Sequence, residues 1–287
     1  MMNVIKMDLY RMVKQKISYI LLVALTAFLV FSVAMTAFLV FSVAMTKEDM
    51  AMTQTPMTAE QASEESMGNL GLYLNVPAAS AQDVTVDLEV FSHMASRAPA
   101  IFTAIFAVIF LTADLQTGYI KNIAGQIEKR QWLIYSKAVV LAVYTAVSFI
   151  VTLITITLSC VVFFGKATIS SFPKLMAYMG GEYMLYLAFG CIILCLAVII
   201  RNHAVTVALA ICLCMNIQLV LYGVINSLLG RAGVDGMNIS EYTVSGWMSC
   251  LSLGASAGDM LRGIVIALIF GAAALTVAVI VFKQRDI

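Results

Sequence analysis

Six apolar runs constrain this chain more than any other feature of its sequence. A helix needs about 20 apolar residues to cross the hydrocarbon core of a bilayer, and within lipid it must satisfy its own backbone. Six runs are long enough: 17–45, 93–113, 138–164, 178–200, 204–224 and 261–282. The chain of 287 residues is 62% hydrophobic and 11% charged, whereas soluble domains carry about 25% charged residues. We therefore expect an all-α integral membrane protein, with six transmembrane helices in a single domain over residues 1–287.

The distribution of charge predicts the orientation of these helices. Lys and Arg accumulate in short cytoplasmic segments. With the N-terminus inside, the cytoplasmic segments hold 11 of the 17 basic residues: Lys6, Arg11, Lys14, Lys16, Lys121, Lys129, Arg130, Lys137, Arg201, Lys283 and Arg285. The first outer loop, residues 47–92, instead holds eight carboxylates: Glu48, Asp49, Glu60, Glu64, Glu65, Asp83, Asp87 and Glu89. We expect a multi-pass protein of the cytoplasmic membrane with both termini inside. The net charge of +1 gives no argument for a nucleic-acid partner.

The first 16 residues, "MMNVIKMDLYRMVKQK", are basic and amphipathic. Their apolar side chains follow helical spacing, with the basic residues elsewhere around the helix: Val4, Ile5, Leu9, Met12 and Val13. This pattern predicts an interfacial helix on the cytoplasmic leaflet. The alternative is a positively charged tail that only sets the topology.

The first apolar run contains an exact repeat, because Ala27–Thr36 recurs as Ala37–Thr46. The run is longer than the apolar core of a cleaved secretory signal, so we expect a retained helix. A helix over 17–46 would reach about 45 Å, against a hydrocarbon core of about 30 Å. Ten residues at about 100° each turn the second copy about 80° away from the first, so the two share no continuous stripe. The repeat therefore predicts a tandem duplication that extends the helix into the outer space, and it gives no functional site.

Two short motifs hint at enzymatic chemistry, and neither has the context it needs. Phe163–Thr168, "FFGKAT", lacks both the first glycine and the hydroxyl residue of a phosphate-binding loop. Gly254–Gly258, "GASAG", matches the serine hydrolase pattern around Ser256, but the predicted topology places His203 on the opposite face. We therefore expect no enzymatic activity in this chain.

Polar residues inside the predicted spans are few. Asn216 and Gln218 form the most polar pair within a span, and they fit either interhelical hydrogen bonds or a substrate path. Glu182 is expected just before the fourth helix. Because ion-coupled carriers use ionisable groups within the membrane, this distribution argues against such a carrier.

The predicted cytoplasmic loop, residues 114–137, is much longer than a turn between helices requires. Its apolar side chains form a stripe: Tyr119, Ile120, Ile123 and Ile127. Gly118 and Gly125 bracket a short helix in this loop. This pattern predicts a short amphipathic helix that docks on a membrane surface or on a protein.

The sequence "ADLQTGYIKNI" at 113–123 resembles the motif after the second helix of type-2 ABC transporter permeases. Asp114 takes the acidic position, Gly118 the glycine and Lys121 the lysine, while Tyr119 stands where Thr is more usual. "YSK" at 135–137 and the tail "FKQRDI" at 282–287 also fit the family. The order and spacing of these motifs on a six-helix frame carry the resemblance over essentially the whole chain.

The resemblance implies the membrane subunit of an ATP-driven exporter. Two permease copies, as a homodimer or heterodimer, would pair with ATP-binding subunits that hold ATP and Mg²⁺, so this chain would carry no cofactor. The implied ATPase-coupling residues are Asp114, Thr117, Gly118, Tyr119, Ile120, Lys121 and Asn122. The stretch 226–259 would contain short outer helices that dip back into the membrane before the sixth helix. The implied substrates are amphipathic peptides, drugs or lipids, including antimicrobial peptides, and the acidic outer loop would attract cationic ones.

Two other functions fit the same sequence. One is a non-transporting membrane sensor or assembly protein with a ligand-binding outer loop. The other is an ion-coupled secondary carrier.

Overall fold

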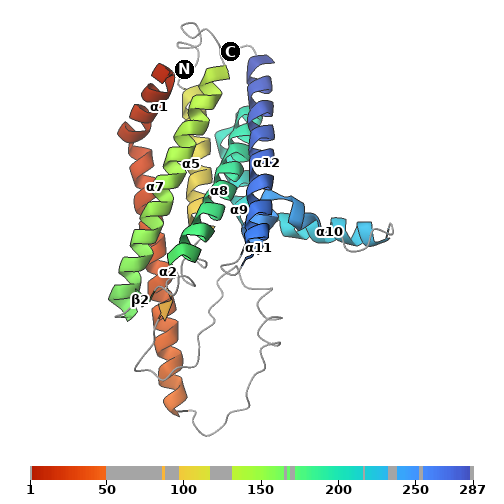
Figure 1. Ribbon diagram of the computed structural model, residues 1–287. Coiled ribbons are helices and arrows are strands. Elements are labelled where there is room, and N and C mark those ends of the chain that lie inside the picture. Colours follow the sequence, from red (N-terminus) through yellow and green to blue (C-terminus); the bar gives the residue numbers. More distant parts are fainter. Residues whose placement is uncertain are drawn as a thin grey trace.

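A computed structural model describes residues 2–49, 86–87, 97–116, 131–164, 167–168, 172–215, 217–231, 238–251 and 255–284. Within these ranges the chain is almost entirely helical (Figure 1). Five helices are long and apolar enough to cross a membrane: α2 (Lys16–Asp49), α5 (Arg97–Gln116), α7 (Gln131–Phe164), α8 (Phe172–Ile200) and α12 (Ala257–Gln284). The structure therefore bears out a multi-pass helical membrane architecture, with five spanning helices in the described residues where the sequence predicts six.

The expected fifth span, 204–224, is not a single helix. It is divided into α9 (His203–Cys214) and α10 (Gln218–Arg231), so the prediction of one continuous helix is wrong. With 12 residues, α9 is about 18 Å long, which is shorter than the hydrocarbon core. α9 packs on α5 and α8, whereas α10 points away from the bundle (Figure 1).

A tight turn reverses the chain between α8 and α9. Arg201 has a left-handed backbone with φ of 56°, and the side chain of Asn202 caps α9 by accepting a hydrogen bond from Val205 N at 3.3 Å. Only two residues thus connect the end of α8 to the start of α9. This turn sets the two helices side by side.

The N-terminal segment forms the predicted helix, α1 (Met2–Lys14), which continues into α2 after a break at Gln15. α2 extends beyond the end of the other helices (Figure 1). The prediction that the duplicated residues lengthen the first helix is therefore confirmed. In the first copy Leu29 and Val33 are buried against the bundle.

The largest helix interface joins α8 to α12 and is built from small residues. The buried face of α12 carries them at helical spacing: Gly263, Ala267, Gly271, Ala274 and Ala278. A side chain at Gly271 would stand 3.5 Å from the backbone of Ala188 in α8. In lipid, where apolar burial gives little drive, such close backbone approach is a main source of helix association.

α7 carries a stripe of buried hydroxyls toward the bundle. Thr145, Ser148 and Thr152 each donate to the carbonyl oxygen four residues earlier, at 2.8–2.9 Å. These hydroxyls are thus satisfied within their own helix, as lipid requires. Nearby, Tyr144 of α7 stacks on Phe106 of α5 with ring centroids 3.7 Å apart.

The structure gives the predicted cytoplasmic loop shorter bounds than the sequence does. Asp114 belongs to α5, and residues 131–137 form the first two turns of α7, so the predicted loop 114–137 is too long.

Within the predicted outer stretch 226–259 lie a 3-10 helix, η1 (Ile239–Tyr242), and α11 (Val244–Cys250). Two-residue strands, β1 (Val86–Asp87) and β2 (Ala167–Thr168), pair in parallel. α1 and the last turns of α12 lie at the same end of the bundle (Figure 1).

Candidate functional site: a buried charge network

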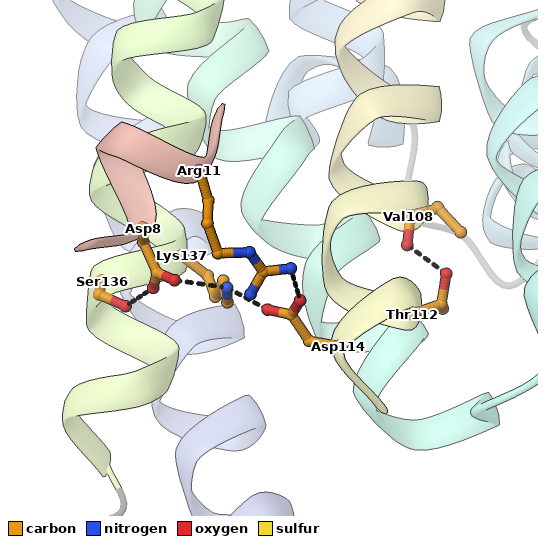
Figure 2. Close-up of polar contacts among 7 residues, drawn as sticks. All are labelled: Asp8, Arg11, Val108, Thr112, Asp114, Ser136 and Lys137. Atoms are coloured by element: carbon orange, nitrogen blue, oxygen red, sulfur yellow. Dashed lines mark hydrogen bonds and ion pairs between the residues drawn. The ribbon is translucent and has the colours of Figure 1, made fainter. Parts of the chain in front are cut away.

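Four charged side chains from three helices meet at the end of the bundle where α1 lies. Asp8 and Arg11 come from α1, Asp114 from the last turns of α5, and Lys137 from the second turn of α7 (Figure 2). Asp8 and Asp114 are completely buried, and Lys137 is 2% exposed. We refer to these four residues as the charge network.

Lys137 is the centre of the network, because its ammonium group contacts both carboxylates. Its Nζ donates to Asp8 Oδ1 at 3.0 Å and to Asp114 Oδ2. Arg11 donates to the other oxygen of Asp114, and the hydroxyl of Ser136 donates to Asp8 Oδ2 (Figure 2). Every carboxylate oxygen of the network therefore accepts a hydrogen bond.

The network is balanced in charge and shielded from solvent. Two cations face two carboxylates, so the cluster carries no net charge. Lys137 also lies over the ring of Phe110, with Nζ 4.2 Å from the centroid, and Arg11 lies 5.8 Å from the same ring. Burying a charge is tolerated when it is paired and hydrogen-bonded, and removing one partner is then costly. The arrangement ties α1, α5 and α7 to one another.

Local sequence explains how each helix presents these groups. Asp8 and Met12 are four residues apart, so both lie on the buried face of α1. Ser136 and Lys137 are adjacent on α7, which lets both reach the same carboxylate of Asp8. Two residues before Asp114, Thr112 hydrogen-bonds His203 at 2.8 Å, which attaches the start of α9 to the same end of α5.

Sequence reasoning identified half of this network. Asp114 and Lys137 were recognised as motif positions, although nothing in the sequence pairs them. The role of Asp8 was missed, because a carboxylate on an amphipathic helix is ordinarily exposed. A single acidic residue on the face of α1 that carries Leu9 and Met12 was the available signal.

Most of the predicted coupling residues cannot be placed. Thr117, Gly118, Tyr119, Ile120, Lys121 and Asn122 lie outside the described residues, as does Asn216. Of the predicted substrate-path pair, Gln218 is described: it is the first residue of α10, and its side chain is 6% exposed.

A second buried carboxyl group lies within the membrane-spanning part of α8. The prediction that Glu182 lies just before the fourth helix is wrong: the predicted run 178–200 already includes it, and α8 begins ten residues before it, at Phe172. Glu182 is about 6 Å from the midpoint of α8, at a rise of about 1.5 Å per residue. Its side chain is completely buried. An ionisable group at this depth is costly and is a candidate for function.

The surroundings of Glu182 satisfy only one of its two oxygens. Tyr178 donates to Oε1 at 3.0 Å, while Oε2 accepts no hydrogen bond from the described residues. The hydroxyl of Tyr186, one turn further along α8, also lies near this carboxyl group. Arg97, the first residue of α5, acts on it through its charge.

Ser256 caps a helix and has no catalytic partner among the described residues. Its Oγ accepts from Asp259 N at 3.2 Å, as the hydroxyl of an N-cap residue does, and donates to Asp259 Oδ2 at 2.7 Å at the start of α12. His203 lies at the far end of the bundle, beside Thr112. The hydrolase pattern is thus explained by the start of α12.

Comparisons with known proteins give no family: no family model matches the chain, and no curated protein matches its sequence.

Proposed function

We propose that this chain is the permease subunit of an ATP-driven exporter. It would pair with a separate ATP-binding subunit and with a second permease copy, and would move an amphipathic peptide, drug or lipid out across the cytoplasmic membrane. The membrane-spanning helices and the motif at 113–123 support this proposal. ATP and Mg²⁺ would be held by the partner subunit.

The charge network is the observation that carries the proposal. Asp114 is three residues before Thr117, where the predicted coupling residues continue, and it is held by Lys137 of α7 and Arg11 of α1. A force applied by a partner to the segment after α5 would therefore act on three helices together. Such a connection between a cytoplasmic docking segment and the helix bundle is what an ATP-driven permease requires.

On this proposal the predicted coupling residues would have different roles. Asp114 is completely buried, so it would act by holding α5 to α1 and α7 and would not touch the partner itself. The docking contacts would fall to residues 117–122. Lys137 and Asp8 would transmit the movement, with Ser136 fixing the orientation of Asp8.

The test is isolation of the tagged chain from its native membrane. We expect a protein with a phosphate-binding loop to co-purify, to be identified by mass spectrometry, and to be encoded by a neighbouring gene. Lys121→Glu should abolish the association, while Lys174→Glu, at the opposite end of the bundle, should leave it intact. Equal recovery of the ATPase with Lys121→Glu, or no such ATPase with the unchanged chain, would contradict the proposal.

Glu182 favours one other function, an ion-coupled carrier. The sequence argued against this class because no carboxylate was expected inside a span, and Glu182 now lies there. A carrier of this kind would transport without ATP and would stop when the ion gradient collapses. Transport that is lost on ATP depletion but survives collapse of the gradient excludes it.

A further inference from the structure

The side of α1 that faces away from the charge network is basic. Asp8 is the only acidic residue of α1, and it is buried in the network on the opposite side of the helix. Lys6, Tyr10 and Lys14 follow one another at intervals of four residues, so they share one face, and all three are exposed. Among the described residues, no carboxylate forms an ion pair with Lys6 or Lys14. This face therefore carries positive charge that the described part of the chain does not neutralise.

The junction between α1 and α2 adds a further lysine at the start of a membrane span. The apolar span in α2 begins at Lys16. Lys14 and Lys16 are exposed on either side of the break at Gln15, and their Cα atoms are at most about 7 Å apart. The Nζ of Lys14 lies 5.1 Å from the centre of the Tyr10 ring, a cation–π contact that favours this position of the ammonium group. Two exposed ammonium groups thus lie where lipid headgroups meet the hydrocarbon core.

An exposed apolar strip continues from Lys16 along α2. Ile20 and Val23 are four and seven residues after Lys16, so the three side chains lie on one face of the helix. Ile20 and Val23 are 61% and 66% exposed, and Tyr19 beside them is 53% exposed. The surface therefore passes from lysines to apolar side chains. An anionic phospholipid presents its headgroup and its acyl chains in the same order.

We propose that this surface is a binding site for an anionic phospholipid of the leaflet at this end of the bundle. The ammonium groups of Lys14 and Lys16 donate hydrogen bonds to the headgroup phosphate. The acyl chains lie along Ile20 and Val23, and Lys6, further out on α1, adds to the local positive charge. The lipid holds α1 from outside while the charge network holds it from inside. The site requires no ATP-binding partner and does not rest on the proposed function.

Positive charge beside a span also follows from membrane topology alone, and the two explanations differ for the folded chain. The preference for positive charge in cytoplasmic segments sets orientation and requires no particular lysine. A lipid site instead requires Lys14 and Lys16 to contribute more than other exposed lysines. Lys283 is the comparison, because it is exposed in the last turn of α12 at the same end of the bundle (Figure 1).

The test is lipid binding to the full chain, purified in a neutral detergent and followed by native mass spectrometry. The probes are dioleoylphosphatidylglycerol and dioleoylphosphatidylcholine, which share their acyl chains. The unchanged chain should bind phosphatidylglycerol about tenfold or more tightly, because each lysine at an anionic surface contributes about fivefold. The double variant Lys14→Gln, Lys16→Gln should lose about tenfold or more of this affinity and keep its affinity for phosphatidylcholine.

A second double variant controls for net charge. Lys174→Gln, Lys283→Gln removes two exposed lysines elsewhere and should bind both lipids like the unchanged chain. Equal losses in the two double variants, or equal binding of the two lipids by the unchanged chain, would overturn the proposal. Glycerophosphoglycerol, the headgroup without acyl chains, should not compete at the concentration of the lipid. Equal competition would contradict a site that includes Ile20 and Val23.

Lysine acetylation tests the same site in the unchanged protein. In nanodiscs, phosphatidylglycerol in place of phosphatidylcholine should slow acetylation of Lys14 and Lys16 more than that of Lys283. Equal slowing of all three lysines, or no slowing, would refute the site. Protection of Lys14 and Lys16 by a co-purifying protein in phosphatidylcholine nanodiscs would assign this face to a protein partner, and would refute it as well.

Discussion

Replacing Lys137 with methionine removes the centre of the charge network while keeping side-chain length. Two buried carboxylates would then share a single cation, Arg11, which is 28% exposed. Removing one partner of a buried ion pair costs about 3–5 kcal/mol, because the remaining charge is left uncompensated. The contact of Lys137 with the ring of Phe110 is also lost. We expect Lys137→Met to lower the free energy of unfolding by about 3–5 kcal/mol.

A second substitution should restore most of this loss. Asp8→Asn in the Lys137→Met background leaves Asp114 paired with Arg11, and it removes the other uncompensated carboxylate. Replacement of a whole buried pair by neutral groups is often close to neutral. The double variant should therefore be more stable than Lys137→Met by about 2 kcal/mol or more.

The assay is reversible unfolding in mixed micelles with a denaturing detergent, followed by helix content. Lys283→Met, at an exposed position of α12, is the matched control and should stay within about 0.5 kcal/mol of the unchanged chain. The reasoning is refuted if Lys137→Met behaves like Lys283→Met. It is also refuted if the effects of Asp8→Asn and Lys137→Met simply add.

Three further predictions concern the helices, each read by the same unfolding assay. Gly190→Ala should lower the free energy of unfolding by about 1–3 kcal/mol, because the new Cβ would stand 2.8 Å from Leu141 Cδ2. Gly180→Ala is the control: its Cβ would enter open space, so this variant should be neutral or stabilising. Equal effects of the two substitutions would contradict this packing. Ser256→Ala should lower the free energy of unfolding by about 1 kcal/mol, because α12 loses its N-terminal cap. It should not change labelling of the chain by a fluorophosphonate probe. Loss of labelling in this variant would instead support a serine hydrolase site at Ser256. Deletion of Ala37–Thr46 should shorten α2 by about 15 Å. Membrane insertion and stability should stay intact, because the end of α2 extends beyond the other helices (Figure 1). Failure of the shortened chain to insert would show that the extension is required.

Hydropathy predicted the long helices because lipid demands apolar side chains over a fixed length. It failed near Met215 and Ile217, where no proline or glycine marks the break and two amide side chains, Asn216 and Gln218, are too few to interrupt an otherwise apolar run. It also started α8 six residues too late, at 178, because Lys174 lowers the apolar signal at the start of a continuous helix. Sequence alone does not reveal that Glu182, further along this helix, is completely buried.

The charge network shows a different limit. Asp114 and Lys137 stood out through their motifs, but Asp8 is 129 residues from Lys137, and no local pattern joins them. Pairing at that separation depends on how α1 packs on α7. The same holds for Glu182, which is influenced by the charge of Arg97 at the start of α5, 85 residues earlier in the chain.

The most direct test of the account is hydrogen exchange in α1 of the chain isolated with its ATP-binding partner. If the charge network links the docking segment to the bundle, nucleotide trapping should change exchange of the backbone amides of Met2–Lys14. The Asp8→Asn, Lys137→Met double variant should still assemble with the ATPase and lose that change. Exchange of α1 that is identical with and without nucleotide in the unchanged complex, or that responds equally in the double variant, would contradict the account.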